Sequence, residues 1–390
     1  MKIIYYSKPC FADCDIPLIK EMQERGIDVY YYIPIPRNFV SSSVIEFPKP
    51  VRKYGLICAK ELPEMAYLSK MLDLSKVFFI SGFRRTPLSI LSWLLWFKVA
   101  FHMLKKCADI FHITWQFSLC FEKLFYYFKP CKNVVMTVHD PFSHTGNDSS
   151  IEERRRIKTF SYANAYLLLN KTFVNRFAKH YGKNIKQIFV SRLGSYDVLG
   201  LFPDGKRTDL DNYILFFGTI NKYKGIEYLL EAMSLVHKDY PRLKLVIAGS
   251  GKFYFDVSKY TRNDYVKIIH KYLTMGELSC LIKNAKFVVC PYTDGTQSGV
   301  INTCFTLCKP IVATNVGAFS ESVIDGKNGF LVSPKDSIKL AEKISELENN
   351  PILITEMASY IREEWLPNHG WKDIVNDYVK CYNNVLYDEK

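Results

Sequence analysis

The feature that most constrains the fold is a regular alternation between short apolar runs and longer segments with helical periodicity. The apolar runs are rich in β-branched and aromatic residues: KIIYYS, DVYYYIPIP, DIFHITW, NVVMTVHD, NAYLLLN and QIFVSRL in the first half, and YILFFGT, KLVIAGS, VKIIHKY, FVVCPY and PIVATN in the second. Runs of this kind are typical of parallel strands that helices cover on both faces. The sequence therefore predicts an α/β chain built from doubly wound sheets.

Length and turn formers predict two such domains. A chain of 390 residues exceeds the usual size of one hydrophobic core. Residues 202–212 are dense in turn-forming and charged residues, which are typical of a linker. We expect an N-terminal domain over 1–205, a C-terminal domain over 206–365, and a terminal amphipathic helix over 366–390 that packs back on the first domain. Ligands of doubly wound sheets bind at the carboxyl ends of the strands, so two facing sheets imply a cleft between the domains.

Charge and cysteine content bear on partners and compartment. Residues 1–200 contain 29 Lys and Arg against 16 Asp and Glu, whereas residues 201–390 contain 23 of each. The basic first half suits anionic lipid or an anionic substrate, and no nucleic-acid motif accompanies it. The 11 cysteines include no Cys-x-x-Cys pair and the chain opens without a signal-like region, so we expect a cytoplasmic protein.

Two glycine-containing segments after apolar runs are candidates for phosphate binding. Thr219–Gly225 follows YILFFG and places Lys224 before a helix, where a cation and the helix dipole would both favour an anion; the alternative is a solvated lysine in a turn. Pro291–Asn302 follows FVVC, and its amides around Gly299 could cradle phosphate oxygens; the alternative is a simple helix cap.

These residues resemble a known family. FFGTINKYKGIEYLLEAM, LVIAGSGKF and CPYTDGTQSGVINTCFTLCKPIVATNVGAFSESVIDGKNGFLV are similar to the nucleotide-binding half of the retaining glycosyltransferases of family four. The resemblance is continuous from about Tyr213 to Pro334 and weaker over residues 1–200. It implies the GT-B architecture, in which two Rossmann-like domains close on a nucleoside-diphosphate sugar of UDP or GDP type. It also implies that no metal and no separate cofactor take part.

The resemblance assigns roles to individual positions. Catalytic roles fall to His139, Lys224 and Asp294, although His139 also fits a hydrogen-bonded residue at a strand end. The nucleotide-sugar would contact Gly218, Thr219, Lys224, Gln297, Ser298, Gly299, Val300, Asn302 and Thr303.

The sequence departs from the family twice. Thr219 stands where an arginine is common, and Asn302 or Thr303 stands where the second of two glutamates is common. The missing arginine removes one charge-assisted contact of about 1.5–3 kcal/mol, which corresponds to roughly 10- to 100-fold in rate. Lys222 or an arginine of the first domain could take the place of the missing arginine.

The loop Ser7–Asp15 replaces the family's frequent paired glycines. Asp13 and Asp15 form an Asp-x-Asp pair that elsewhere binds metal with nucleotide-sugars. We assign them to the acceptor side or to the loop itself, because the resemblance implies no metal.

Residues 87–104 form an apolar segment with basic flanks at Arg84-Arg85 and Lys105-Lys106. The segment is too short and too polar to span a bilayer. One interpretation is a buried core helix. The other is an interfacial helix that contacts the membrane through Trp93, Trp96, Lys98, Lys105 and Lys106.

These observations predict an enzyme of polysaccharide biosynthesis, at most peripheral to the inner face of the cell membrane. It would move a hexose from the donor to a hydroxyl of a glycan or lipid-linked acceptor, with retention of the anomeric configuration. The alternative is a non-catalytic, membrane-docked protein that binds nucleotide-sugars. A nicotinamide-dependent enzyme ranks last because no G-x-G-x-x-G follows an expected strand.

Overall fold

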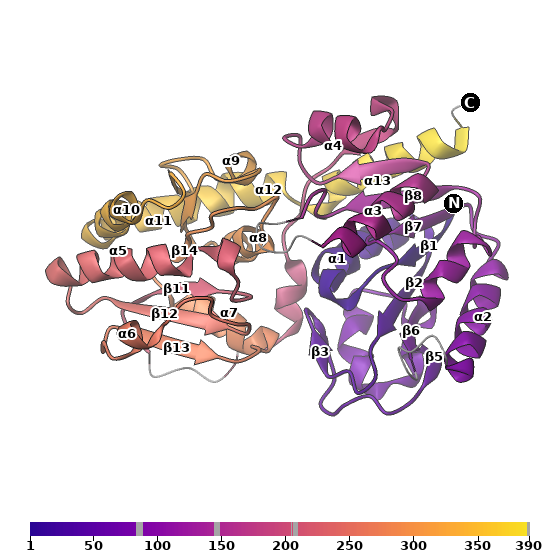
Figure 1. Ribbon diagram of the computed structural model, residues 1–390, viewed down its shortest axis with the longest axis horizontal. Coiled ribbons are helices and arrows are strands. Elements are labelled where there is room, and N and C mark those ends of the chain that lie inside the picture. The colour runs from indigo at the N-terminus through magenta and orange to yellow at the C-terminus, as the bar shows by residue number, and fades with distance from the viewer. Residues whose placement is uncertain (83–88, 144–148, 204, 206–209, 388–390) are drawn as a thin grey trace. The chain divides into compact units, whose positions relative to one another are not determined.

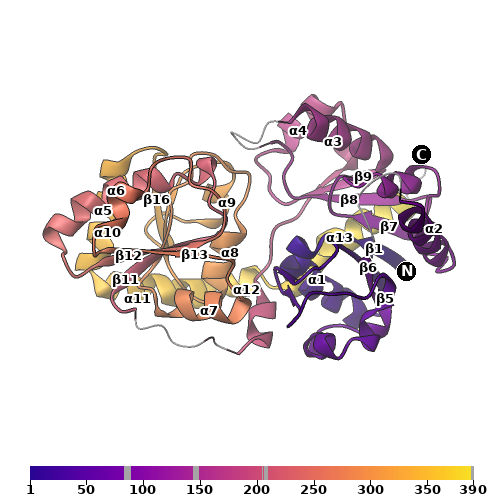
Figure 2. The ribbon, with the colours of Figure 1, turned by 60° about the horizontal axis from the view of Figure 1, so that its bottom comes forward.

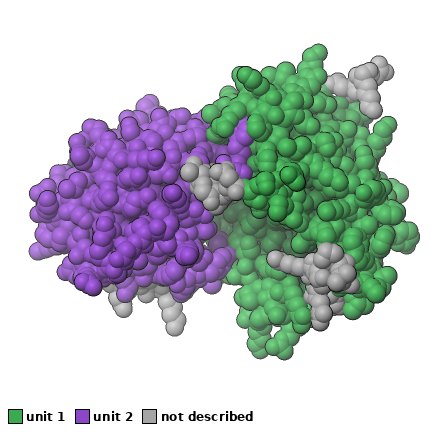
Figure 3. Space-filling view, in the orientation of Figure 1, with its two compact units in different colours: residues 1–141, 149–201, 371–390 green, residues 142–148, 202–370 purple. Residues whose placement is uncertain are grey.

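The computed structural model describes residues 1–82, 89–143, 149–203, 205 and 210–387. The chain divides into two compact units (Figure 3). The first contains residues 1–141, 149–201 and 371–390, and the second contains residues 142–148 and 202–370. The sequence analysis placed the boundaries after residues 205 and 365, a few residues from these.

The described part of the first unit contains an eight-stranded sheet in the order β10-β9-β8-β7-β1-β2-β6-β5. All neighbours pair in parallel except β5 with β6. The strands are β1 (Lys2–Tyr6), β2 (Asp28–Ile35), β5 (Gly55–Cys58), β6 (Val77–Ser81), β7 (Ile110–Ile113), β8 (Val134–Val138), β9 (Ala165–Leu168) and β10 (Ile188–Val190), with a separate hairpin of β3 (Ser41–Ser42) and β4 (Ile45–Glu46).

Successive side chains of β1 point to opposite faces of this sheet, as the pleat requires. Tyr5 faces Asp15 of α1 and Tyr382 of α13, whereas Tyr6 faces Trp96 of α2 and Phe125 of the short 3-10 segment η5. Helices therefore cover both faces (Figure 1): α1 (Ala12–Glu24), α2 (Ile90–Leu104), η5 (Phe121–Tyr126), α3 (Ser150–Tyr162), α4 (Val174–Tyr181) and α13 (Trp371–Tyr387).

The C-terminal helix α13 belongs to the first unit. The Trp371 indole donates to the Ser195 carbonyl at 2.6 Å, and the Tyr382 hydroxyl is hydrogen-bonded to His112 at 2.9 Å. A Cβ on Gly194 would lie 2.5 Å from the Trp371 ring, so only glycine allows the indole to pack there.

The second unit contains a six-stranded parallel sheet in the order β13-β12-β11-β14-β15-β16 among its described residues. The strands are β11 (Tyr213–Phe217), β12 (Lys244–Gly249), β13 (Val266–His270), β14 (Val288–Cys290), β15 (Ile311–Thr314) and β16 (Gly329–Val332). The helices around it (Figure 2) are α5 (Ile226–Asp239), α6 (Ser258–Thr261), α7 (Met275–Asn284), α8 (Gly299–Thr306), α9 (Phe319–Ser322), α10 (Ser337–Asn349), α11 (Pro351–Tyr360) and α12 (Leu366–Asn368), with a π-turn over Ile361–Trp365.

In each sheet the strand order reverses beside its first strand. β1 lies between β2 and β7, and β11 lies between β12 and β14. Right-handed crossovers then place the helices on opposite faces on the two sides of that strand. The predicted pair of doubly wound, Rossmann-like domains is confirmed, and each sheet has the switch point at which such folds bind ligands.

Candidate functional site

In the second unit, the loops after β11 and β14 meet at the switch point. The Thr293 amide donates to the Tyr223 carbonyl at 2.8 Å, which ties the second loop to the first. Gly225 adopts φ +61°, and a Cβ there would lie 2.1 Å from the Pro291 carbonyl oxygen. A glycine is therefore required where α5 begins, because it lets the two loops touch backbone to backbone.

Lys224 lies at this junction, in the short 3-10 segment η8 (Lys222–Lys224). The side chain is only 8% exposed, and its Nζ lies 3.7 Å from the centre of the Tyr292 ring and 4.8 Å from that of Tyr223. A merely solvated turn lysine would be exposed. The two aromatic rings instead hold the ammonium at the carboxyl edge of the sheet, next to the start of α5.

The first turn of α8 presents backbone donors to the same place. Ser298 is the residue before α8 and its side chain does not cap the helix. The first amides of a helix have no acceptor within it, so those of Gly299 and Val300 can bind an anion. Gly218 adopts φ +120°, and a Cβ there would lie 3.7 Å from the Val300 side chain, so the end of β11 lies beside this turn.

The turn before α8 is held from behind by the loop after β15. The Ala318 amide donates to the Thr296 carbonyl at 3.1 Å, and Gly317, at φ +54°, lies too close to the Gly295 carbonyl oxygen to carry a Cβ. Asp294 and Gln297 belong to this turn and are both partly exposed. The turn is therefore braced by backbone contacts, and both residues remain only partly exposed.

Asn302 and Thr303 lie inside α8 and are buried, at 4% and 5% exposure. The Thr303 hydroxyl donates to the Gly299 carbonyl at 2.7 Å, within the helix. Both positions considered for a ribose contact are therefore buried, and the Thr303 hydroxyl bonds within the helix.

A cavity of about 820 Å³ opens beside these loops, at the ends of β11 and β12. Sequence reasoning missed half of its wall. Thr219–Lys222 supply one side, and Gly251–Asp256, which include three consecutive aromatic residues, supply the other. The Tyr254 hydroxyl is buried and has no hydrogen bond within the described part of the chain. Aromatic rings beside Lys222 and Lys252 suit a nucleobase and its phosphates. The sequence signal that could have revealed this wall is the aromatic run FYF, which closely follows the glycine at the end of β12.

In the first unit, His139 follows β8 at the carboxyl edge of the sheet. The ring is 6% exposed and stacks on Phe11, with 3.9 Å between ring centres and 13° between ring planes. Desolvation lowers the pKa of His139 to about 4, against a smaller opposing effect of Asp140. The imidazole is therefore neutral near pH 7 and acts there as a hydrogen-bonding group rather than as a cation. His144, a weaker candidate from the sequence for the same role as His139, lies outside the described residues.

The expected loop over Ser7–Asp15 is wrong. Pro9–Phe11 form a 3-10 turn and α1 begins at Ala12, so Asp13 and Asp15 lie in its first turn, where the helix dipole favours acids. The Asp15 carboxylate is 2% exposed and accepts from the hydroxyls of Tyr5 at 2.8 Å and Tyr31 at 3.0 Å. Asp15 is thus a core residue and not an acceptor ligand. Within the described chain, no group of three or more His, Cys, Asp and Glu could hold a metal.

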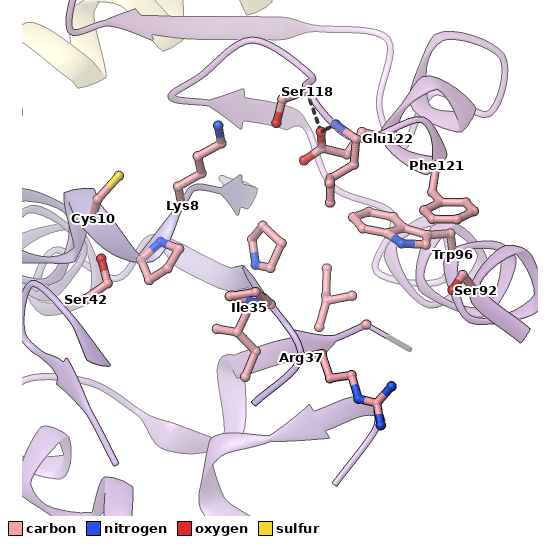
Figure 4. A pocket seen from close by; sticks show the side chains of 16 residues that line it. Lys8, Cys10, Ile35, Arg37, Ser42, Ser92, Trp96, Ser118, Phe121 and Glu122 are labelled. Atoms are coloured by element: carbon pink, nitrogen blue, oxygen red, sulfur yellow. Dashed lines mark hydrogen bonds between the residues drawn. The ribbon is translucent and has the colours of Figure 1, made fainter. Parts of the chain in front are cut away.

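A second cavity, of about 720 Å³, lies at the carboxyl edge of the first unit's sheet (Figure 4). Its lining is mainly apolar and comes from the ends of β1, β2 and β6, from α2 and from η5: Lys8, Pro9, Cys10, Pro34, Ile35, Pro36, Arg37, Ser42, Ile80, Gly82, Ser92, Trp96, Ser118, Leu119, Phe121 and Glu122. Sequence reasoning did not find this cavity, because five separate segments of the chain form it.

Three charged side chains line this second cavity. Glu122 is 1% exposed and accepts from the Ser118 and Leu119 amides at 2.6 Å each and from the Tyr6 hydroxyl at 2.5 Å. Its hydrogen bonds are therefore internal. Lys8 lies 4.9 Å from the centre of the Trp115 ring, and desolvation lowers the pKa of its amine. Arg37 is exposed at the edge (Figure 4). The two cations make the cavity suited to a ligand with an apolar part and an anionic group.

The prediction that Trp96 contacts the membrane is wrong. The indole is 3% exposed and packs edge-on against Tyr6 and Phe125, because this face of α2 covers the sheet. Trp93 is partly buried against Phe121, at 4.9 Å between ring centres. Lys98 and Lys105 are exposed and Lys106 is partly exposed, whereas Arg84 and Arg85 lie outside the described residues. Among the described helices, none is both long enough and apolar enough to cross a bilayer.

Comparison with known proteins assigns the second unit to a family. Residues 201–364 match the family model of the group 1 glycosyl transferases. The chain is 27% identical to an uncharacterised glycosyltransferase of Methanocaldococcus jannaschii over 45% of its length and 48% of that protein. It is 25% identical to spore coat protein SA of Bacillus subtilis over 64% of both chains. The matches thus span about half to two thirds of these relatives. Residues 201–364 form a domain of the group 1 glycosyl transferase family.

Solved structures extend the comparison to the whole fold. The Anabaena protein HepE, determined in complex with UDP-glucose, aligns over 97% of this chain and 99% of its own, with a TM-score of 0.69 and 16% identity. Sucrose-phosphate synthase from Thermosynechococcus elongatus aligns over 100% of both chains, with a TM-score of 0.70 and 14% identity. The expected GT-B fold, with its two Rossmann-like domains, is therefore confirmed.

Proposed function

We propose that this protein transfers a hexose from a nucleoside-diphosphate sugar to an acceptor hydroxyl, with retention of the anomeric configuration. The observation that carries the proposal is the junction of the loops after β11 and β14. There the buried Lys224 ammonium, the start of α5 and the first turn of α8 come together. A cation and helix N-termini at a switch point form a site for a diphosphate.

The adjoining cavity gives the donor an orientation. In our proposal the base enters the cavity walled by Phe253, Tyr254 and Phe255, and the diphosphate extends toward Lys224 and the α8 amides. Lys222 lines the same cavity and supplies positive charge near Thr219, where the family commonly has arginine. The UDP-glucose complex of HepE supports a donor of this class.

The site chemistry concerns the leaving group. The bond between the anomeric carbon and the diphosphate oxygen breaks, the acceptor oxygen bonds to that carbon, and the acceptor proton leaves with the departing diphosphate. Negative charge grows on the diphosphate during this step, so Lys224 and the amides of Gly299 and Val300 stabilise the transition state more than the ground state. The family resemblance supports retention and a metal-independent reaction.

The lining of the first unit's cavity favours an acceptor that is anionic and partly apolar. Its apolar lining would contact a lipid or sugar face, while Lys8 and Arg37 would pair with a phosphate. A lipid-linked precursor of a glycan has this chemistry. We therefore propose that transfer takes place at the cytoplasmic face of the membrane. Neutral His139 would donate or accept a hydrogen bond at a sugar hydroxyl.

A thermal-shift screen tests the donor site. UDP, GDP and their hexose derivatives are added singly to the purified protein, and the unfolding midpoint is recorded. A ligand at 100 times its dissociation constant stabilises the folded protein by about 2.7 kcal/mol. We expect one nucleotide class to raise the midpoint and the Lys224→Ala variant to lose that rise. No rise with any nucleotide would contradict the proposal.

The alternative of a non-catalytic nucleotide-sugar-binding protein is favoured by Thr219 and by the uncharged Asn302. Binding alone does not separate the two functions, but release of nucleoside diphosphate from the donor does. A protein that binds a nucleotide-sugar tightly and never releases its diphosphate would be the binding protein.

A further inference from the structure

The outer face of α2 is an apolar stripe that no other described segment covers. Six large hydrophobic side chains of this helix are at least 39% exposed: Ile90, Leu91, Leu94, Phe97, Phe101 and Leu104. From Leu91 on, the spacing of three and four residues places them along one side of the helix, opposite the buried Trp96 and Val99. A solvated helix would carry polar residues on this side.

The segment after η5 extends the stripe. Tyr127 is 78% and Phe128 is 46% exposed, and the Phe128 ring lies edge-on to Phe97 with 5.7 Å between ring centres. The exposed side chains therefore form one continuous patch, hereafter the α2 patch. Contiguous apolar surface of this kind marks a protein or membrane contact.

The exposed charges on α2 and on residues 121–132 are all positive. Lys98 and Lys105 are exposed on α2 itself, and the Lys105 ammonium lies 4.6 Å from the centre of the Phe101 ring. Lys123 and Lys129 are exposed on the neighbouring segment. The sequence of α2 contains no acidic residue, and the one acid over residues 121–132, Glu122, is buried.

We propose that the α2 patch docks the first unit on the surface of an anionic lipid bilayer. The apolar side chains would enter the boundary between headgroups and acyl chains, and the lysines would lie at the anionic headgroups. A second copy of the chain suits the patch less well, because a two-fold contact would bring like charges together. This inference is independent of the proposed transfer reaction, since docking needs neither donor nor acceptor.

Phosphatidylcholine vesicles, with and without about one third phosphatidylglycerol, test the proposal by co-sedimentation of the full chain. The parent should bind the anionic vesicles at low salt and lose binding at high salt. Leu94→Gln with Phe101→Gln should weaken binding at least about 10-fold, because two exposed apolar side chains no longer enter the lipid. Lys98→Gln with Lys105→Gln should weaken it by about 30-fold, at about fivefold for each lysine.

Ile352→Gln is the matched control, because Ile352 is 71% exposed on α11 of the second unit. It should leave binding unchanged. All substituted side chains are exposed, so the unfolding midpoint and nucleotide affinity should match those of the parent. The proposal is overturned if the parent ignores anionic vesicles or if both double variants bind as well as the parent. A concentration-dependent dimer that only the α2 variants dissolve would assign the patch to self-association instead.

Discussion

The Lys224 ammonium is held between two aromatic rings and is almost excluded from solvent. We predict that Lys224→Ala lowers turnover at least roughly 100-fold, because it removes the buried cation that faces the departing diphosphate. Steady-state release of nucleoside diphosphate measures the effect. Lys259→Ala, at an exposed lysine of α6, is the control and should have no effect. Equal kinetics in a folded Lys224→Ala protein would remove the residue from the site.

We predict that the stability of the folded protein depends on pH through the buried carboxyl of Asp15. Desolvation raises the pKa of this carboxyl to about 7, although Ser7, Tyr5 and Tyr31 hydrogen-bond to its charged form. The folded protein then binds the proton more tightly than the unfolded chain, so the free energy of unfolding falls as pH rises from about 4 to 7. The loss is at most about 4 kcal/mol. Asp15→Asn should flatten this slope in urea unfolding at several pH values, and parallel slopes would refute the assignment.

Individual site residues were only partly predictable. Lys224 could be found because it precedes a helix after an apolar run, but its burial depends on Tyr292, which the loop after β14 supplies. The core position of Asp15 was hidden for a similar reason. Its partner Tyr31 comes from β2, so the chain pattern around Asp13 and Asp15 could not show that the carboxylate faces inward.

Among the elements, α8 bears most directly on donor binding. We predict that Gly299→Val abolishes nucleotide binding, because a branched side chain on the first residue of the helix blocks access to its amides. Calorimetry with UDP and GDP measures the affinity. Gly200→Val is the matched control, since a Cβ there meets open space. Undiminished affinity would mean that the turn only caps the helix.

At this scale the strands were well predicted and the surfaces of helices were not. Eleven apolar runs correspond to strands of the two sheets, whereas β5, β6 and β16 were missed. β5 pairs antiparallel at the edge of the first sheet, and β16 lies at the edge of the second sheet. For α2 the core interpretation is correct for the face that contains Trp96, and the interfacial interpretation stays a prediction for the exposed face. Sequence alone could not tell which face of α2 is buried, because both faces are apolar.

At the scale of the whole molecule, α13 ties the end of the chain to the first unit. We predict that Trp371→Ala destabilises that unit by about 3–5 kcal/mol, because the indole is 4% exposed and fills the space above Gly194. Hydrogen exchange should quicken in β1, β7 and β8 and stay unchanged in β11 and β12. Tyr387→Ala, at a residue 76% exposed on the same helix, is the control. Equal acceleration in both units would contradict this assignment.

The most direct measurement of the central claim is release of nucleoside diphosphate from UDP- and GDP-hexoses, with water or a lipid extract as acceptor. The account predicts that one donor class is consumed, that the product first carries the donor's anomeric configuration by NMR, and that Lys224→Ala loses the activity. A folded protein that binds the donor and releases no diphosphate under any of these conditions would contradict it.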